Sequence, residues 1–430
     1  MAEQEFIIVG DVLKKYTGKG GKVVIPDGVR EVDYFAFSDC GEVTELIIPE
    51  TFRDSLWDED DTKKLRPNKY DNAYYLGTED NPYFLLYKAK NREITSCEIH
   101  KDTKVIGHGA FALCKNLESL VIHDGVIYVD SSVCFWCDGL KRLTIGRGVE
   151  EINTAAFAEC RALEEVIFNA ERLKDLTNEN DVFKSAGING DGVRLTIGKN
   201  VLRIPEHLCY PNVDYEYYPK FTHVEFEEGS LCESIGVCAF FSCTYLKHLK
   251  LGENIKLIDR CAFKYCHALR SLTIPDSVER LEYMCFAHAD HIRELKFGAG
   301  LKYIGHGAFY DILFFEGTIE IPDSVEEIAQ YAFKDCANVS EVVLGSGVSV
   351  IGESAFNNCY RMKQVNLPKS LREIGEDAFG RCIGLKTASF EKKSGWVVGD
   401  TKLSADELRG VKKSAALLSQ TYCKEAWSNK

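Results

Sequence analysis

The fold is decided by the stretch Ala262-Phe263-Lys264-Tyr265-Cys266, because its pattern Ala-Phe-x-x-Cys recurs along the chain. The phenylalanines at this position are spaced by 23 residues, with one step of 24: Phe240, Phe263, Phe286, Phe309, Phe333, Phe356 and Phe379. A constant period of this length is typical of a solenoid, in which each repeat packs only on its neighbours. The sequence therefore predicts an elongated stack of coils.

One repeat, residues 269–292, shows how each coil closes. Leu269, Leu272 and Ile274 lie in a short apolar alternation, as in a strand with one buried face. Pro275 donates no ladder hydrogen bond and therefore suits the end of that strand. The Ala-Phe-x-x-Cys segment is expected to form one helical or 3₁₀ turn, whose Phe fills the wide part of the coil. Each coil has an open apolar face above and below, so only stacking closes the core.

The full unit resembles the BspA-like (Treponema-type) leucine-rich repeat, L-x-x-L-x-I-P-x-x-V-x-x-I-G-x-x-A-F-x-x-C. A close match is Ile321–Ile328, which is followed by Ala332-Phe333 and Cys336. The resemblance runs from about Val23 to Phe390. It implies an α/β solenoid, a right-handed superhelix with a concave parallel sheet, short helical or 3₁₀ turns on the other side, and a cap at both ends.

The places where the repeat begins, breaks and ends define three parts. They are a capping hairpin at 1–22, a solenoid at 23–390 with an irregular insert at about 51–93 and longer units at about 170–235, and a C-terminal cap at 391–430. The first hairpin is predicted from Phe6–Val9 and Val12–Tyr16, because the end of a solenoid exposes an apolar face that must be covered.

The insert and the C-terminal cap carry their own local signals. Tyr74–Leu76 and Tyr83–Tyr87 flank turn residues and predict a second hairpin. Trp396–Val398 is expected to form a last strand. Ser404–Glu407 has the spacing of a capping box, which predicts a helix from near Ala405. One face of that helix is expected to carry Leu408, Val411, Ala415 and Leu418.

The family resemblance also implies a kind of function. Members of the BspA-like family are commonly bacterial surface proteins that bind host matrix proteins or other cells, so the resemblance implies a binding module. The inserted hairpin and the terminal Trp-containing segment resemble elements of members from gut bacteria, which implies a bacterial origin.

Composition narrows the function classes. The net charge of −14 argues against a nucleic-acid partner, because such binding rests on clustered Lys and Arg. No apolar run approaches the ~20 residues of a membrane span. The N-terminus has neither a basic nor an apolar leader region, so the sequence as given predicts a cytoplasmic protein. The family resemblance implies the cell surface or secretion if a leader has been removed.

The 17 cysteines allow two interpretations. Most recur once per repeat, after the Phe, and are expected to be small buried thiols rather than disulfides. Cys134 and Cys137 form a C-x-x-C pair that could be redox-active. Both fall at core positions of the repeat, which favours inert packing.

The outward side chains of the concave sheet are the predicted binding surface, for a protein or a glycan ligand. Alternation turns them away from the core, and neighbouring strands bring them together. The candidates are Arg194, His223, Glu225, His248, Lys250, Glu294, Lys296 and Glu320. The alternative is an ordinary solvated sheet face.

Other functions remain open at this stage. His223, His248 and Glu225 could hold a metal and serve an enzyme, and a structural surface-layer role is a further alternative. No nucleophile elbow, phosphate loop or His-Glu-x-x-His is present, so neither a catalytic set nor a cofactor is predicted. Tyr215–Tyr218 could form a recognition loop or fold back on the solenoid. His108 and His306 share one repeat position and are expected on the convex side.

Overall fold

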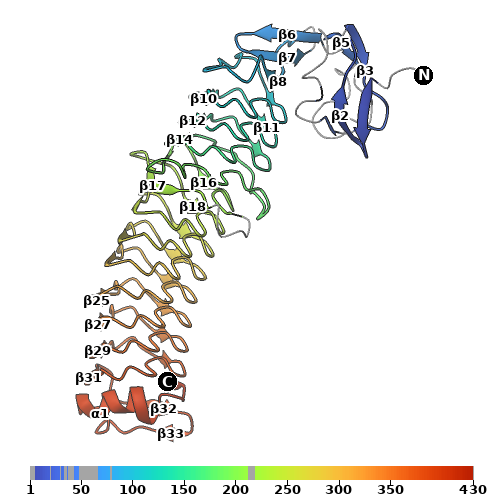
Figure 1. The fold of residues 1–430 in the computed structure, drawn as a ribbon. Helices are drawn as coiled ribbons and strands as arrows, with labels where there is room; N and C mark the ends of the chain where they lie inside the picture. Colours follow the sequence, from blue (N-terminus) through green and yellow to red (C-terminus); the bar gives the residue numbers. More distant parts are fainter. Residues whose placement is uncertain are drawn as a thin grey trace. The chain divides into compact units, whose positions relative to one another are not determined.

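The structure, a computed structural model, describes residues 5–19, 21–29, 31–32, 36, 43–47, 66–77, 80–211 and 218–429. Residues 215–217 of the predicted tyrosine loop lie outside these ranges. The chain divides into two compact units, Met1–Val193 with Asn212–Pro219, and Arg194–Pro211 with Lys220–Lys430. We call them the N-terminal and C-terminal units. In Figure 1 each unit shows stacked coils, which confirms the predicted solenoid.

In the N-terminal unit, the first strands form small sheets, and the later ones belong to the stacked coils. The described residues of this unit contain fourteen short strands. They are β1 (Phe6–Val9), β2 (Val12–Tyr16), β3 (Gly21–Val24), β4 (Glu31–Val32), β5 (Val43–Ile47), β6 (Arg66–Tyr70), β7 (Ala73–Gly77), β8 (Leu85–Ala89), β9 (Val105–Ile106), β10 (Ser119–Ile122), β11 (Tyr128–Val129), β12 (Arg142–Ile145), β13 (Glu151–Ile152) and β14 (Glu165–Phe168). The coils place β10, β12 and β14 in one parallel sheet, and β9, β11 and β13 in another.

In the C-terminal unit each coil likewise contributes one strand to each of two ladders. The longer strands are β15 (Val193–Ile197), β17 (Phe221–Phe226), β19 (His248–Lys250), β21 (Ser271–Thr273), β23 (Glu294–Lys296), β25 (Gly317–Glu320), β27 (Val339–Val343), β29 (Gln364–Leu367) and β31 (Thr387–Phe390). The two-residue strands are β16 (Arg203–Ile204), β18 (Ser234–Ile235), β20 (Leu257–Ile258), β22 (Arg280–Leu281), β24 (Tyr303–Ile304), β26 (Glu327–Ile328), β28 (Val350–Ile351) and β30 (Glu373–Ile374). We call these the long-strand face and the short-strand sheet.

The core of the C-terminal unit is organised around one column of stacked phenylalanine rings. Consecutive rings have centroids 5.1 to 5.6 Å apart and are tilted by no more than 12°. All are buried, and they are the residues that set the sequence period: Phe240, Phe263, Phe286, Phe309, Phe333, Phe356 and Phe379. The prediction that only stacking closes the core is thus confirmed in physical detail.

The repeat cysteines have a polar role in addition to filling space. The Cys266 thiol donates a hydrogen bond to the carbonyl of Phe240 on the preceding coil, with sulfur and oxygen 3.4 Å apart. The same contact recurs between Cys382 and Phe356, at 3.1 Å. Each of these carbonyls also accepts a local amide hydrogen bond, from Cys243 and Cys359 respectively, so the thiol is a second, weak donor to the same oxygen.

The Ala-Phe-x-x-Cys segment contains the expected i→i−3 hydrogen bonds but is not helical. Cys261 and Tyr265 have φ angles of 54° and 65°, in the left-handed region. The Phe263 amide donates across the stack to the carbonyl of Cys285, at 2.8 Å. The Lys264 amide closes a local turn on the Cys261 carbonyl, at 3.1 Å. Amides therefore alternate between local and inter-coil acceptors, which a continuous helix does not allow.

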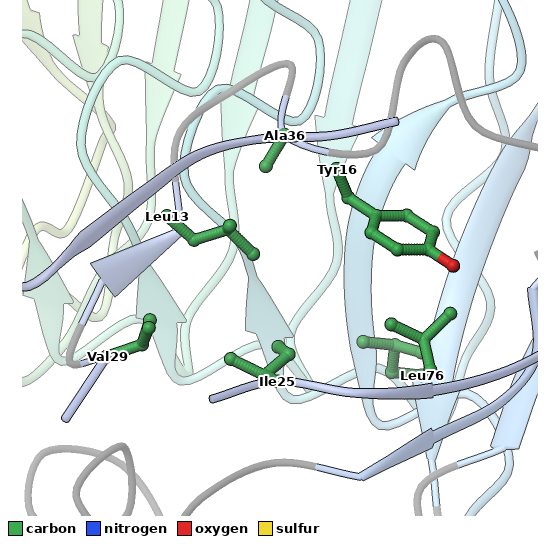
Figure 2. Packing of buried hydrophobic residues seen from close by; sticks show 7 residues of the cluster. Leu13, Tyr16, Ile25, Val29, Ala36 and Leu76 are labelled. Carbon is green, nitrogen blue, oxygen red and sulfur yellow. The ribbon is translucent and has the colours of Figure 1, made fainter. Parts of the chain in front are cut away.

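The N-terminal hairpin is confirmed, since β1 and β2 pair in antiparallel register. Figure 2 shows the buried cluster beneath it, in which Leu13 and Tyr16 of the hairpin meet Ile25, Val29 and Leu76. This cluster joins the hairpin, the first coil and strand β7 in one apolar core.

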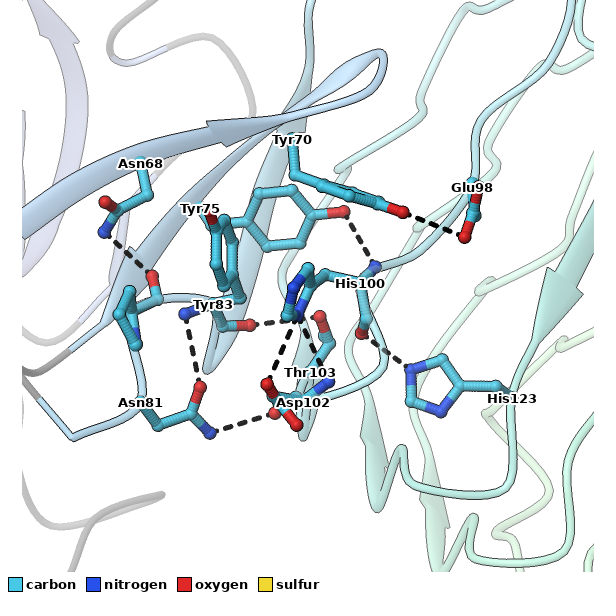
Figure 3. A network of polar contacts seen from close by, with 11 residues as sticks. Asn68, Tyr70, Tyr75, Asn81, Tyr83, Glu98, His100, Asp102, Thr103 and His123 are labelled. Carbon is cyan, nitrogen blue, oxygen red and sulfur yellow. Dashed lines mark hydrogen bonds and ion pairs between the residues drawn. The ribbon is translucent and has the colours of Figure 1, made fainter.

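The predicted insert hairpin is also confirmed, as antiparallel strands β7 and β8. Strand β6, which pairs with β7, was not expected from the sequence. Figure 3 shows what fixes the insert: the His100 amide donates to the Tyr75 hydroxyl at 3.2 Å, and the Tyr83 ring stacks on His100 with centroids 3.8 Å apart. Thr103 donates to the Tyr83 carbonyl at 3.0 Å.

The C-terminal cap differs from its prediction in where the helix starts. Strands β32 (Trp396–Val398), β33 (Thr401–Lys402) and β34 (Trp427–Asn429) close the short-strand sheet, and helix α1 (Val411–Ala416) runs into a π-helical turn (Leu417–Thr421). The capping-box contacts do form, with Ser404 and Glu407 2.9 Å apart.

These contacts close a non-helical turn, however, and the α-helix begins only after Gly410. The prediction of a helix from near Ala405 is therefore wrong. Leu408, Ala415 and Leu418 are buried as expected, whereas Val411 is 43% exposed at the first turn of α1.

Candidate functional site

The long-strand face brings most of the predicted site residues into register. His223 is paired with His248 and Glu225 with Lys250, on strands β17 and β19. On the next pair of strands, Ser271 is opposite Glu294 and Thr273 is opposite Lys296. The exposed members among the candidates are Arg194, His248, Lys250, Glu294, Lys296 and Glu320.

Arg194 and Glu225 form an ion pair across this face. Arg194 Nη1 lies 3.1 Å from Glu225 Oε1, and the two side chains are 47% and 40% exposed. At that exposure the pair contributes little to stability, about 0–1 kcal/mol. The ion pair matters for the site because Arg194 neutralises Glu225, the carboxylate beside the two histidines.

The two histidines stack instead of converging on a point. The rings of His223 and His248 have centroids 4.4 Å apart and planes 19° apart. Burial lowers the pKa of His223, and the nearby His248 and Arg194 lower it further. A lowered pKa keeps His223 neutral near pH 7, so the stack carries no repulsion between two imidazolium groups.

This geometry does not support the metal hypothesis for His223, His248 and Glu225. Imidazole nitrogens direct their lone pairs in the ring plane, so stacked rings do not aim both at one ion. The carboxylate is engaged by Arg194. Among the described residues, no three or more His, Cys, Asp or Glu side chains are grouped to hold a metal.

The structure reveals a row of basic residues that the sequence reasoning missed. Lys247, Arg270 and Arg293 occupy the same position on consecutive coils, immediately before β19, β21 and β23, and all are exposed. With Lys250 and Lys296 they form what we call the basic patch. The signal in the sequence is a basic residue every 23 positions. Each one directly follows the inward-pointing Leu or Ile that precedes a strand.

The basic patch has almost no compensating charge. Glu294 is the carboxylate on its strands. None of the ion pairs found among the described residues involves Lys247, Lys250, Arg270, Arg293 or Lys296. Five exposed cations thus lie on neighbouring rungs roughly 4.8 Å apart.

Further along the same edge lies an open groove of about 530 Å³. Lys363 and Lys386 line it, in the same repeat position as Arg293, together with Gly317 and Ser340. Arg361 at its side lies 3.9 Å from Glu316. The basic row therefore continues beyond the patch, interrupted where Gly317 and Ser340 replace the cations.

The remaining candidates have structural environments. His306 stacks on Tyr283 with centroids 5.0 Å apart. Cys134 and Cys137 are fully buried, as their core positions predict, and burial raises the pKa of Cys134 well above its ordinary value. Of the tyrosine loop, Tyr218 is described and half-buried. Among the described residues, no helix has the length and apolar character that a membrane span requires.

Coils with one long strand, one short strand and a Phe column define this chain as a leucine-rich repeat solenoid. Residues 15–55, 87–209, 211–316 and 315–397 match the family described as BspA type leucine-rich repeat region (6 copies). The chain belongs to this family, as its repeat motif predicts. A comparison with curated proteins gives no match.

Among the similar solved structures are leucine-rich repeat proteins of bacteria. One from Bacteroides ovatus is 18% identical, with a TM-score of 0.34 over 78% of this chain and 94% of that one. A leucine-rich cell surface protein from Faecalibacterium prausnitzii is 18% identical, with a TM-score of 0.34 over 81% and 97%. One from Eubacterium ventriosum is 15% identical, with a TM-score of 0.37 over 77% and 95%.

Proposed function

We propose that the chain is a non-enzymatic scaffold that binds a protein or a glycan through the long-strand face. The observation that carries this proposal is the basic patch, five exposed cations without ion-pair partners on three adjacent strands. The stacked core fixes the backbone positions of these cations, so a ligand has to order only their side chains. The groups that contact the patch are therefore anionic, such as the carboxylates of an acidic peptide or the sulfates of a glycan.

The charge of the rest of the chain sharpens this expectation. The protein as a whole is acidic, with a net charge of −14, so a cationic cluster on it is a local exception. At physiological ionic strength the field of a charge extends only about 8 Å, so the patch rather than the net charge governs a ligand in contact with it. Charge complementarity of this kind contributes mainly specificity and association rate.

Arg194, His223, Glu225, His248, Glu294 and Glu320 complete the proposed binding surface around the patch. The Arg194–Glu225 pair and the stacked histidines offer a less charged area beside it. Display at a bacterial cell surface is part of the same proposal, because a ligand on another cell or in an extracellular matrix reaches the patch only there.

The test compares two double variants of the full chain that remove the same charge. Lys250→Ala with Lys296→Ala removes two cations of the patch, and Lys402→Ala with Lys412→Ala removes two exposed cations of the C-terminal cap. Binding of a polyglutamate peptide and of a sulfated oligosaccharide is measured by titration at low and at physiological salt. We expect the patch variant to weaken binding by about tenfold or more, with the larger loss at low salt.

The control variant should bind like the original chain, and both should melt within a few degrees of it, because exposed substitutions change stability by only ~0.5 kcal/mol. Equal loss in both variants, or no binding of either probe to the original chain, would contradict an anion-binding face while leaving the fold intact.

A further inference from the structure

The open groove of about 530 Å³ lies where the Phe column takes its single 24-residue step, between Phe309 and Phe333. The strand register shifts there between Gly317 and Thr318. A Cβ on Gly317 would meet nothing within 4 Å, so the space beside this residue is open. The extra residue of this repeat therefore falls at the groove, which explains why the recess occurs on these coils.

The floor of the groove is low because its polar side chains lie along the stack. The Ser340 hydroxyl donates a hydrogen bond to the Gly317 carbonyl at 2.9 Å. The Asn338 amide group donates to the Leu313 carbonyl at 2.6 Å. Both side chains are thus held against the preceding coil instead of standing out from their own, and the groove stays open above them.

One side of the groove is cationic. Lys363 and Lys386 line it on consecutive coils and are exposed. None of the ion pairs found between described residues involves either lysine. Two nearby carboxylates have other partners, since Glu316 lies 3.9 Å from Arg361 and Glu341 accepts a hydrogen bond from a glutamine amide on β29. The two lysines are therefore left for the carboxylates of a ligand.

Apolar side chains border the groove opposite the lysines. Leu313, Tyr360 and Ile383 share one repeat position, which we call the apolar row, and they are 38%, 43% and 79% exposed. Tyr360 and Ile383 directly precede the lining residues Arg361 and Gly384. Along each of these coils the apolar residue comes before the lining position and the lysine after it, so the two rows flank the groove. Single exposed apolar residues are ordinary on a protein surface, but a row of them beside a groove indicates a contact surface.

We propose that the groove binds an extended peptide segment in which acidic and apolar residues alternate. Successive side chains of an extended chain point to opposite sides, so the carboxylates face Lys363 and Lys386 while the apolar side chains meet the apolar row. The lining residues come from four consecutive coils, three steps of roughly 4.8 Å, which is the length of about four extended residues. The groove lies on β25 to β31, whereas the basic patch lies on β19 to β23, so this site goes beyond the function proposed above.

Two other occupants match the groove less well. A fatty acid has one carboxylate for two lysines, and an open groove leaves much of its acyl chain in water, whereas sites for small apolar ligands enclose most of the ligand surface. A sulfated glycan matches the lysines but has no aliphatic side chains to cover Leu313 and Ile383. The alternating peptide is the occupant that complements both rows.

The experiment titrates the full chain with a short fluorescent peptide of alternating Asp and Leu. The comparison ligands are a peptide of alternating Asp and Ser, a peptide of alternating Lys and Leu, and decanoate as the fatty acid. We expect the Asp-Leu peptide to bind about tenfold tighter than each of the others, or better, because it alone complements both the lysines and the apolar row.

A first pair of variants tests the lysines. Lys363→Ala with Lys386→Ala should weaken binding of the Asp-Leu peptide by about tenfold or more, with the larger loss at low salt. Lys250→Ala with Lys296→Ala removes the same charge from the basic patch, and it should bind this peptide like the original chain.

A second pair of variants tests the apolar row. Tyr360→Ser with Ile383→Ser should weaken binding of the Asp-Leu peptide by about tenfold or more, and should leave the weak binding of the Asp-Ser peptide unchanged. Leu202→Ser with Leu231→Ser is the matched control, because these side chains are 54% and 46% exposed on other coils, and it should bind like the original chain.

Circular dichroism establishes that each variant is folded. A further measurement does not depend on the variants: a photoreactive leucine analogue in the Asp-Leu peptide should cross-link to residues 360–363 and 383–386, read by mass spectrometry. The groove is ruled out as the site if the cross-links lie elsewhere, if the original chain does not bind the Asp-Leu peptide, or if the patch variant loses as much affinity as the groove variant. Equally tight binding of decanoate or of the Asp-Ser peptide would overturn the choice of ligand. Because polyglutamate tests the patch and the Asp-Leu peptide tests the groove, either site can fail without the other.

Discussion

The rings of Phe263 and Phe286 lie face to face on consecutive coils, with centroids 5.1 Å apart and planes 3° apart. Each ring thus packs against its own counterpart in the next repeat. A residue in this column belongs to two interfaces, one above and one below, so the stability of a coil depends on its neighbours.

Replacing Phe263 by Ala should lower the free energy of unfolding by about 3–5 kcal/mol, through lost burial and the cavity left behind. Because the ring contacts both Phe240 and Phe286, hydrogen exchange should accelerate in the coils on both sides. Phe314→Ala is the matched control, since that ring is 46% exposed, and it should cost under about 1 kcal/mol. Loosening confined to a single coil would contradict a shared core.

The thiols that follow the Phe column should be unreactive in the folded protein. Cys243, Cys266, Cys336, Cys359 and Cys382 are all buried and free. Alkylation with a small reagent should be slow under native conditions and complete in denaturant, read by mass spectrometry of peptides. Fast native labelling of these five, or disulfides joining them, would be incompatible with their place in the core.

Gly347 lies in the turn after strand β27, where a side chain should not fit without a shift of the neighbouring coil. A Cβ on Gly347 would lie against the carbonyl oxygen of Asp323 on the preceding coil, well inside van der Waals contact. Neither backbone can move without opening the stack, so Gly347→Ala should destabilise the protein by about 1–3 kcal/mol in a denaturant titration.

Gly190 is the matched control for that substitution, because a Cβ there would meet nothing within 4 Å. Gly190→Ala should be neutral or stabilise by up to about 1 kcal/mol, through reduced freedom of the unfolded chain. Equal effects of the two substitutions would mean that the approach of the coils at Gly347 is not tight.

The features that the sequence predicted are those that repeat. The Phe column, the buried strand positions and the family follow from a 23-residue period, which any buried repeat must keep. The outward register of His223 with His248 also followed, because strand alternation is strict. The short-strand sheet was missed, since its strands have only two residues each and carry no readable alternation.

Other features depend on three-dimensional context that no local pattern carries. Tyr265 and Cys261 have left-handed φ angles, which are incompatible with the helical turn that was expected. The amides there donate hydrogen bonds alternately within the coil and to the next coil. The capping-box contact between Ser404 and Glu407 forms, but no α-helix follows directly after it. The basic patch and the Cys238–Cys261 pair arise from residues 23 apart that become neighbours only when the coils stack, so their chemistry is visible in the fold and not in the chain order.

The last prediction concerns the pH at which Cys261 becomes reactive. The groups that face it are the Cys238 thiol, the guanidinium of Arg260 and the ammonium of Lys264, and together they lower its pKa to about 7. A lowered pKa means that the thiolate is present above about pH 7 and is lost by protonation below it. Alkylation of Cys261, followed by peptide mass spectrometry, should therefore rise through pH 7 and level off above pH 8, because the thiolate is the nucleophile. In Cys238→Ala the thiol that lowers the pKa is removed and no donor replaces it, so the midpoint should move up toward the ordinary value of about 8.5. A midpoint that stays near pH 7 in this variant would assign the effect to Arg260 and Lys264 alone, and a midpoint near 8.5 in the original chain would show that the two thiols do not interact.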